Sequence, residues 1–373
     1  MRLRNGDAAV FALGLTLMGC GAVDALSPQE RSIPGPVPII MDPALASLDE
    51  DRFYVAAGDS MPRIRVRALD SRGRGLSGVY VAFGDRGPDE ARELGIGITD
   101  SAGILAAPRV PAVGVTGRRT LVAAAPGLRE ADFPFLVLPA AYAGPSQRAC
   151  PIPPSLLPLH PQLTRTLAVL RGSDSLRIVA IGSSSTAGVG ATSPSAAYPA
   201  RLESRLRAAY PANKVVVWNK GVSGQLATDM LARFDRDVVA SRPHLVIWQT
   251  GTIEAVSAAP VDAFEATLRQ GIAQLRAAGA DVLLLDSQAY AGKGQEEPYL
   301  AFQRVLWRVG ADLGVPVVTR YQLMAHYQAT GRYTWAQLLS SDSFHPSDLT
   351  YDCTAHLVLA GLMAAQVDPG TTP

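Results

Sequence analysis

The stretch LRIVAIGSSSTAG, residues 176–188, decides the fold class of the second half of this 373-residue chain. Its first six residues form a run that is apolar except for Arg177 and is typical of a buried strand. The run passes directly into a turn in which Gly182 and Gly188 flank the serines. We expect Ser184 to be exposed there, with the N-terminus of a helix behind it favouring a developing negative charge. By itself, the segment favours an ordinary serine-rich turn.

Further apolar runs follow, separated by segments of helical periodicity. The predicted strands are 215–219, 245–249, 282–286 and 316–319, and the predicted helices are 196–209, one from about 227, 261–277, 299–313 and 350–364. Strands that alternate with helices of this length form a parallel sheet covered on both faces. In such sheets chemistry collects at the carboxyl ends of the strands, which is where Ser184 stands.

The segment DSFHP, residues 342–346, precedes the last predicted helix. It places a carboxylate, Asp342, three residues before an imidazole, His345. One loop can therefore supply a general base and the group that orients it. Such a pair occurs by chance, but together with a serine at a strand end it is much more specific, and it predicts nucleophilic catalysis.

Other site types find little support in the sequence. The Ser184 turn lacks the lysine of a phosphate-binding loop and the third glycine of a dinucleotide fingerprint. No cysteine or histidine cluster has metal-ligand spacing, so we expect neither a metal nor an organic cofactor. The formal charge of +1 comes without a basic stripe, which argues against nucleic acid as a partner.

Over 176 to about 365 these motifs resemble the SGNH (GDSL-like) hydrolases. The resemblance implies a three-layer α/β/α, flavodoxin-like domain with a parallel sheet. It also implies that Ser184 attacks an ester carbonyl, that His345 takes and returns the proton, and that Asp342 holds His345. Position 183 is Ser where the Gly-Asp-Ser-Leu form of the family has Asp.

The resemblance also assigns the oxyanion hole. In the block NKGVSG, residues 219–224, the resemblance assigns the backbone N–H of Gly224 as one oxyanion donor. It assigns the backbone N–H of Ser184 as the second. The third block departs from the family, because Ile253 stands where an asparagine should donate and Glu254 stands where Asp is usual. Losing one such donor typically costs about 10²–10³ in kcat. We therefore hypothesise that Ile253 either slows turnover or is compensated by a replacement donor such as Gln249.

The N-terminus resembles the signal peptide of a bacterial lipoprotein. Arg2 and Arg4 precede an apolar run that is too short to span a bilayer and ends in LMGC, residues 17–20. We expect removal of 1–20, acylation of Cys20, and a lipid-anchored protein in the cell envelope. Gly21 after the cysteine favours the outer membrane as the site of the anchor. A plain secretory signal is the alternative.

Two further segments precede the hydrolase domain, which we place at 166–373. Residues 21–50 predict a tether and 139–165 a proline-rich linker. Between them, 51–138 shows alternating strands that predict a small all-β sandwich and resembles bacterial immunoglobulin-like repeats of the invasin type over 64–137. A spacer or carbohydrate-binding module is the expected use.

Two cysteines remain when Cys20 is lipidated, and an exported compartment permits disulfides. Pairing of Cys150 with Cys353 would connect the start of the catalytic unit to its last helix. Two unpaired small apolar residues are the alternative.

The sequence therefore favours a cell-envelope serine esterase that cleaves carboxylic esters, of acetyl or short-chain type, through an acyl-enzyme. An acetylated glycan is the favoured substrate, because a β-sandwich companion suits a polymer. Two alternatives stay open. One is a catalytically impaired binding or adhesion lipoprotein with the same fold, and the other is an acetyltransferase that uses the same triad.

Overall fold

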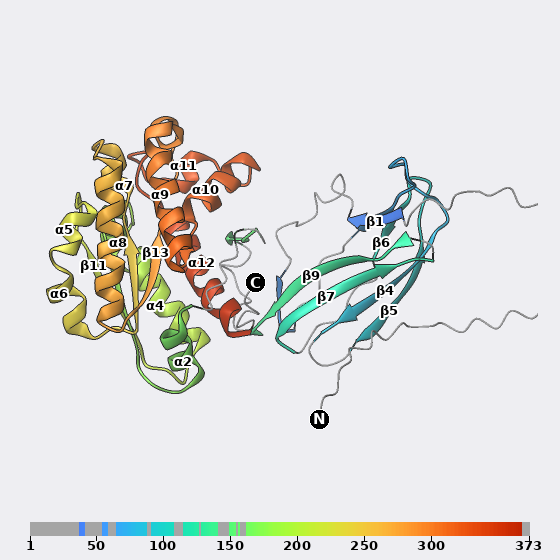
Figure 1. Ribbon diagram of the computed structural model, residues 1–373, viewed down its shortest axis with the longest axis horizontal. Coiled ribbons are helices and arrows are strands. Elements are labelled where there is room, and N and C mark those ends of the chain that lie inside the picture. Colours follow the sequence, from blue (N-terminus) through green and yellow to red (C-terminus); the bar gives the residue numbers. More distant parts are fainter. Residues whose placement is uncertain are drawn as a thin grey trace, which may run out of the picture. The chain divides into compact units, whose positions relative to one another are not determined.

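The computed structural model describes residues 37–41, 54–58, 65–87, 91–107, 115–126, 128–140, 149–153, 156 and 162–367 (Figure 1). The predicted signal peptide, with Cys20, and most of the predicted tether lie outside these residues. Within the described part of the chain, no helix is both long and apolar enough to cross a membrane.

The catalytic half is built on a parallel sheet of five strands. They are β10 (Leu176–Gly182), β11 (Val215–Gly221), β12 (Leu245–Gln249), β13 (Asp281–Leu285) and β14 (Val317–Val318). Their spatial order is β11-β10-β12-β13-β14, and every neighbouring pair is parallel. This is the order of flavodoxin-like sheets, so the predicted fold class is confirmed.

Helices cover both faces of this sheet (Figure 1). One face packs against α2 (Thr164–Arg171), α4 (Tyr198–Ala209) and α12 (Asp348–Val367), and the other against α5 (Ala227–Leu231), α6 (Phe234–Asp237), α8 (Val261–Ala277) and α9 (Glu297–Leu313). Along β10, Ile178 and Ala180 belong to the first core, whereas Val179 and Ile181 belong to the second. Successive residues of a strand point to opposite faces, so a strand buried on both sides reads as a continuous apolar run.

Local differences from the predicted elements have tertiary causes. The helix expected from 227 is divided into α5 and α6 at Arg233, whose guanidinium donates to the carbonyl of Lys220 at 2.8 Å and to Gln225 Oε1 at 2.7 Å. The last strand has two residues instead of four. The remaining helices of this half are α3 (Ser184–Ala187), α7 (Thr252–Val256), α10 (Arg320–Ala329) and α11 (Trp335–Leu338).

The N-terminal region is mostly β, and its described residues form two sheets. One has the order β6-β3-β1-β8 and the other β2-β9-β7-β4-β5. The strands are β1 (Val37–Met41), β2 (Tyr54–Ala56), β3 (Arg65–Ala68), β4 (Tyr80–Arg86), β5 (Arg92–Ile98), β6 (Ile104–Ala106), β7 (Gly117–Ala124), β8 (Leu128–Arg129) and β9 (Ala131–Leu138). Inward-facing residues such as Val81, Phe83 and Leu121 form its core. The β class is confirmed, and the immunoglobulin-like identity stays a prediction.

Strand β1 lies inside 21–50, where the sequence predicted a tether. It pairs antiparallel with β3, and Ile39 lies opposite Ala68. The tether prediction is therefore wrong over Val37–Met41. The apolar run VPIIM gains a hydrogen-bonded partner from a strand that follows more than twenty residues later, which local composition does not reveal.

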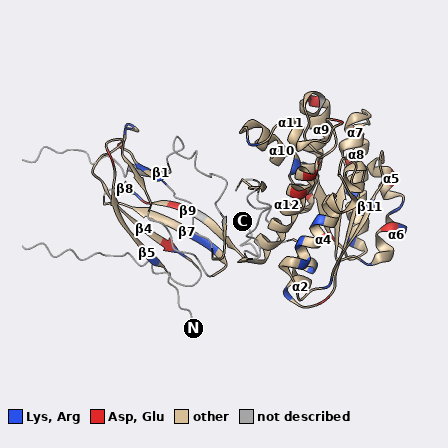
Figure 2. Cartoon of the chain, turned by 180° about the vertical axis from the view of Figure 1, so that it is seen from behind, with Lys and Arg blue, Asp and Glu red and all other residues tan. Residues whose placement is uncertain are grey.

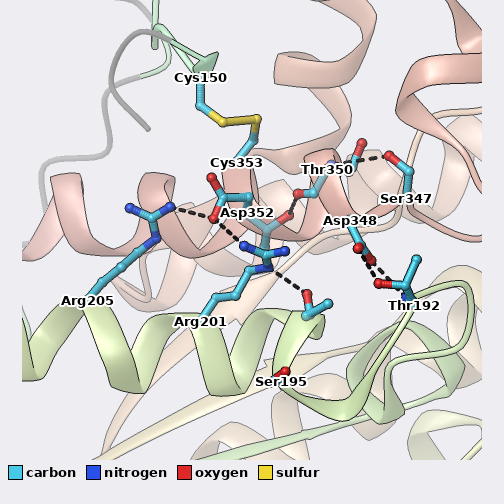
Figure 3. A network of polar contacts seen from close by, with 12 residues as sticks. Cys150, Thr192, Ser195, Arg201, Arg205, Ser347, Asp348, Thr350, Asp352 and Cys353 are labelled. Carbon is cyan, nitrogen blue, oxygen red and sulfur yellow. Dashed lines mark hydrogen bonds and ion pairs between the residues drawn. A yellow bond between two sulfur atoms is a disulfide. The ribbon is translucent and has the colours of Figure 1, made fainter. Parts of the chain in front are cut away.

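A disulfide joins Cys150, in the segment predicted to be a linker, to Cys353 in α12 (Figure 3). Next to it, Asp352 accepts from Arg201 at 3.0 Å and from Arg205 at 2.5 Å, and Figure 2 shows basic and acidic segments on these neighbouring helices α4 and α12. One turn earlier, Asp348 accepts from the backbone N–H of Thr192 at 2.9 Å. These contacts fix the start of α12, which directly follows the loop that carries His345.

Candidate active site

The nucleophile turn depends on two glycines. A Cβ at Gly182, the last residue of β10, would lie 2.2 Å from Thr186 Oγ1, and a Cβ at Gly221 in β11 would lie 2.1 Å from the backbone nitrogen of Ala187. Only glycine therefore allows α3 to pack this closely on the ends of the two strands. Ser184 begins α3 and is 5% exposed, so the expectation of an exposed serine is wrong. The loop that carries His345 lies against it.

Gln249, the last residue of β12, supports this turn from inside the protein. Its side chain is fully buried, and Oε1 accepts from the backbone N–H of Ser183 at 2.9 Å and from Thr186 Oγ1 at 3.1 Å. Its amide nitrogen faces Thr252 Oγ1 at 3.4 Å. Both ends of the amide are thus turned toward the protein interior. The hypothesis that Gln249 replaces the missing oxyanion donor is wrong.

The loop at 342–345 forms a compact turn in which Ser343 has a positive φ of 57°. Asp342 Oδ1 accepts from the backbone N–H groups of Phe344 (2.9 Å) and His345 (2.8 Å) and from Ser340 Oγ (2.8 Å). Oδ2 lies 2.6 Å from His345 Nδ1. Partial burial alone would raise the pKa of Asp342, but these hydrogen bonds outweigh it and hold the pKa well below its usual range. The carboxylate is therefore ionised at neutral pH.

The fold brings the serine and the histidine together across 161 positions of sequence. His345 Nε2 lies 2.9 Å from Ser184 Oγ. An ionised carboxylate can only accept, so Nδ1 of neutral His345 must donate to Asp342 and Nε2 is left to accept the Ser184 proton. This chain of hydrogen bonds has the geometry of an activated serine nucleophile with an oriented general base.

The two expected oxyanion donors lie on adjacent loops. Gly182 and Gly221 are paired in neighbouring strands, and the backbone N–H of Val222 donates to the carbonyl of Gly182 at 2.9 Å. This bond holds the loop that contains Gly224 beside the nucleophile turn. The backbone N–H of Ser184 is one of the first N–H groups of α3, which have no acceptor within the helix.

The third loop contains Ile253, which is half-buried in α7 and offers no side-chain donor. Its neighbour Glu254 is 3% exposed and accepts from the backbone N–H groups of Ala227 and Gly251. Burial raises the pKa of Glu254, and these hydrogen bonds oppose the shift. Glu254 therefore connects this loop to the start of α5. The sequence showed the substitution but not this connection.

Two aromatic rings lie near His345. The rings of Phe344 and His345 meet edge to face with their centroids 4.9 Å apart, and Tyr290 packs on Phe344 in the same way at 4.9 Å. A cavity of about 670 Å³ borders Asp342, and its lining includes Thr192, Gln337, Ser340, Ser341, Ser347 and Asp348. Among the described residues, no group of three or more His, Cys, Asp or Glu could hold a metal ion.

Comparison with known proteins identifies the family of the catalytic half. The model of the Non-GDSL lipase-like family matches residues 149–368. An acetylxylan esterase of Geobacillus stearothermophilus is 24% identical over 174 residues, 44% of this chain and 77% of that protein. Thioesterase 1/protease 1/lysophospholipase L1 of Escherichia coli (strain K12) is 25% identical over 209 residues, 56% of this chain and 91% of that protein.

Solved structures with a similar fold include a two-domain esterase (CEX) active on acetylated mannans, co-crystallised with mannopentaose. It is 18% identical with a TM-score of 0.49, and the match covers 57% of this chain and 55% of that one, so this chain spans about half of that structure. TesA is 24% identical with a TM-score of 0.43 over 50% of this chain and 97% of its own. The chain belongs to the Non-GDSL lipase-like family, and its C-terminal half is an SGNH-type carboxylic ester hydrolase domain.

Proposed function

We propose that the protein is an exported, lipid-anchored serine esterase that removes acetyl or other short acyl groups from glycans at the cell envelope. The observation that carries this proposal is the unbroken hydrogen-bond chain from Asp342 through His345 to Ser184. Each contact is short enough for proton transfer, and the three residues are the ones that a serine esterase requires.

The geometry implies a two-step acyl transfer. Ser184 Oγ attacks the ester carbonyl while its proton passes to His345 Nε2, and Asp342 stabilises the imidazolium that forms. The negative oxygen of the tetrahedral intermediate faces the backbone N–H groups of Ser184 and Gly224. His345 returns the proton to the leaving alcohol, which leaves an acyl-enzyme. A water molecule activated by His345 then releases the acid and restores Ser184.

Several features favour a carbohydrate ester over a long-chain lipid ester. The cavity beside Asp342 presents hydroxyl, amide and carboxylate groups next to the apolar side chains of Ala191 and Leu349, and the polar groups suit a polyhydroxylated substrate. The rings of Phe344 and of Tyr290, which packs on it, are both partly exposed, and we propose that they contact a sugar ring. A relative named for acetylxylan supports the same substrate class. A mostly-β companion region is compatible with a role in holding a polymer.

The cellular location rests on the N-terminal sequence alone. The lipobox-like LMGC at 17–20 supports export and acylation of Cys20, and Gly21 favours the outer membrane. Cys20→Ala should abolish incorporation of labelled palmitate and release the protein from the membrane fraction. A variant that stays in that fraction would contradict a lipid anchor at Cys20.

A second function is favoured by one observation, the apolar Ile253 at the position of an oxyanion donor. In this alternative the domain binds an envelope ligand without turning it over. An intact triad argues against it, because residues kept only for binding need no 2.9 Å contact between Ser184 Oγ and His345 Nε2.

The deciding experiment measures hydrolysis of p-nitrophenyl acetate and butyrate, and release of acetate from acetylated xylan and mannan, by the mature chain. Ser184→Ala is the test variant, and Ser195→Ala, an exposed serine outside the triad, is the control. Turnover that is lost only in Ser184→Ala supports the esterase. No turnover in the wild type, together with no labelling of Ser184 by a fluorophosphonate, would favour the binding protein. Transfer of the acetyl group to an added alcohol faster than to water would indicate a transferase.

A further inference from the structure

A fully buried arginine lies beneath the active site and takes no part in the mechanism above. Arg320 is the first residue of α10, directly after the last strand of the sheet, and is 1% exposed. Burying a guanidinium costs several kcal/mol unless hydrogen bonds and charge compensate. The contacts that Arg320 makes should therefore be functionally or structurally important.

The acceptors of Arg320 come from two separate loops at the carboxyl edge of the sheet. Nη1 donates to Ser185 Oγ at 3.3 Å, and Ser185 directly follows the nucleophile Ser184. Nη2 donates to the backbone carbonyl of Asp286 at 2.6 Å and to Gln288 Oε1 at 3.3 Å. Both of these residues follow β13.

Gln288 extends the connection to the histidine loop. Its Nε2 faces the backbone carbonyl of Phe344 at 3.4 Å, and Phe344 directly precedes His345. The path Ser185–Arg320–Gln288–Phe344 therefore joins the neighbour of the nucleophile to the neighbour of the general base, through the buried side chains of Arg320 and Gln288.

The carboxyl group of Asp286 is not the direct partner of this arginine. Asp286 Oδ1 accepts from the backbone N–H of Tyr321 at 2.9 Å, and Oδ2 lies 3.3 Å from Trp307 Nε1. Arg320 is thus held mainly by neutral acceptors. Because hydrogen bonds are directional, these neutral acceptors fix the orientation of the planar guanidinium. Its several N–H donors can bind acceptors from several loops at once.

We propose that Arg320 is a positioning residue that sets the relative placement of Ser184 and His345 by bridging the nucleophile turn to the histidine loop through Gln288. The inference rests on the catalytic roles proposed above for Ser184 and His345. Misplacement of reacting groups by about 1 Å can cost about 10²-fold in rate, so the bridge should act on kcat more than on substrate binding.

The test compares Arg320→Met, Gln288→Leu and the double variant, with Arg119→Met as the matched control. Arg119 is another fully buried arginine, but it pairs with Asp85 in the β region. Folded fraction is measured by circular dichroism, and kcat and KM for p-nitrophenyl acetate are expressed per folded molecule. We expect Arg320→Met to lower kcat roughly 10–100-fold with KM within about threefold of wild type. The double variant should lose no more than the worse single variant.

Three outcomes would overturn the proposal. They are a kcat per folded Arg320→Met molecule within about threefold of wild type, a similar loss in Arg119→Met, or losses that multiply in the double variant. If Arg320→Met does not fold, Gln288→Leu, Ser185→Ala and their combination are judged by the same criteria, since each removes one partner of the bridge. Wild-type protein without esterase activity or fluorophosphonate labelling would instead refute the proposed function.

Discussion

Removing the Cys150–Cys353 disulfide should destabilise the catalytic domain strongly while leaving its chemistry intact. The bridge spans 203 positions of sequence. In the chain-entropy model a loop of this length restricts the unfolded chain by about 5 kcal/mol at 25 °C, compared with about 3 kcal/mol for a 15-residue loop. That is comparable to the whole stability of many domains, about 5–15 kcal/mol. For a domain of this size, the melting temperature should fall by about 10–20 °C.

The variant to measure is Cys150→Ala combined with Cys353→Ala, unfolded in guanidinium and followed by tryptophan fluorescence. All four tryptophans of the chain, Trp218, Trp248, Trp307 and Trp335, lie in the catalytic half, so the signal reports on that domain. Well below the melting temperature, kcat should match wild type, because neither cysteine contacts the triad.

Reduction provides the matched control. Dithiothreitol should lower the stability of the wild type to that of the double variant, and it should leave the double variant unchanged. A loss below about 1 kcal/mol, in a wild type whose disulfide is verified by mass spectrometry, would refute the entropic argument. A wild type with two free thiols would refute the pairing itself.

Three further predictions concern the triad, the oxyanion site and the buried acid beneath them. Asp342→Asn should lower kcat by about 10⁴-fold, because an amide does not hold His345 in the tautomer that accepts the serine proton. Steady-state kinetics on p-nitrophenyl acetate measure this change in kcat. A loss below about tenfold would contradict the orienting role of Asp342. Ile253→Asn should raise kcat by up to about 10²-fold if the new amide reaches the oxyanion, and an unchanged rate would count against a missing donor as the cause of slow turnover. Burial raises the pKa of Asp286 from 3.8 to about 7 against the hydrogen bond from Tyr321 and the charge of Arg320, so the folded state binds this proton more tightly than the unfolded state. Its contribution to stability is therefore complete below about pH 4 and is lost as the pH rises through about 7. Asp286→Asn should flatten the unfolding free energy over that interval, and an unchanged slope in guanidinium titrations would contradict the shift.

The elements of the catalytic domain could largely be predicted because their signals are local. Each buried strand contains an apolar run, and the run at 178–181 is apolar because Val179 and Ile181 pack on one face while Ile178 and Ala180 pack on the other. Where tertiary contacts compete with local pattern, prediction failed. Arg233 divides the helix expected from 227, and Val37–Met41 finds a strand partner in β3.

The candidate site shows the same division between residues that local sequence identifies and residues whose role depends on tertiary contacts. Asp342 and His345 could be predicted as a pair because they are three positions apart in one loop, and Ser184 because glycine, strand and helix mark its turn. Gln249 could not be assigned correctly, because whether an amide faces the substrate or the protein interior depends on which strand lies beside β10. Glu254 and Arg320 are in the same position, since Ala227 lies 27 residues from Glu254 and the acceptors of Arg320 lie 32 or more residues away from it.

The sequence by itself determined the class of chemistry, because the residue types and their local spacing already specify a serine nucleophile, a base and an orienting carboxylate. It also determined the alternation of strands and helices that makes a parallel sheet. Only the tertiary structure decided that Ser184 Oγ meets His345 Nε2 at 2.9 Å and that Gln249 and Arg320 support the site from within. The physical reason is that hydrogen bonds act over about 3 Å, whereas the order of strands in the sheet decides which distant residues come within that range.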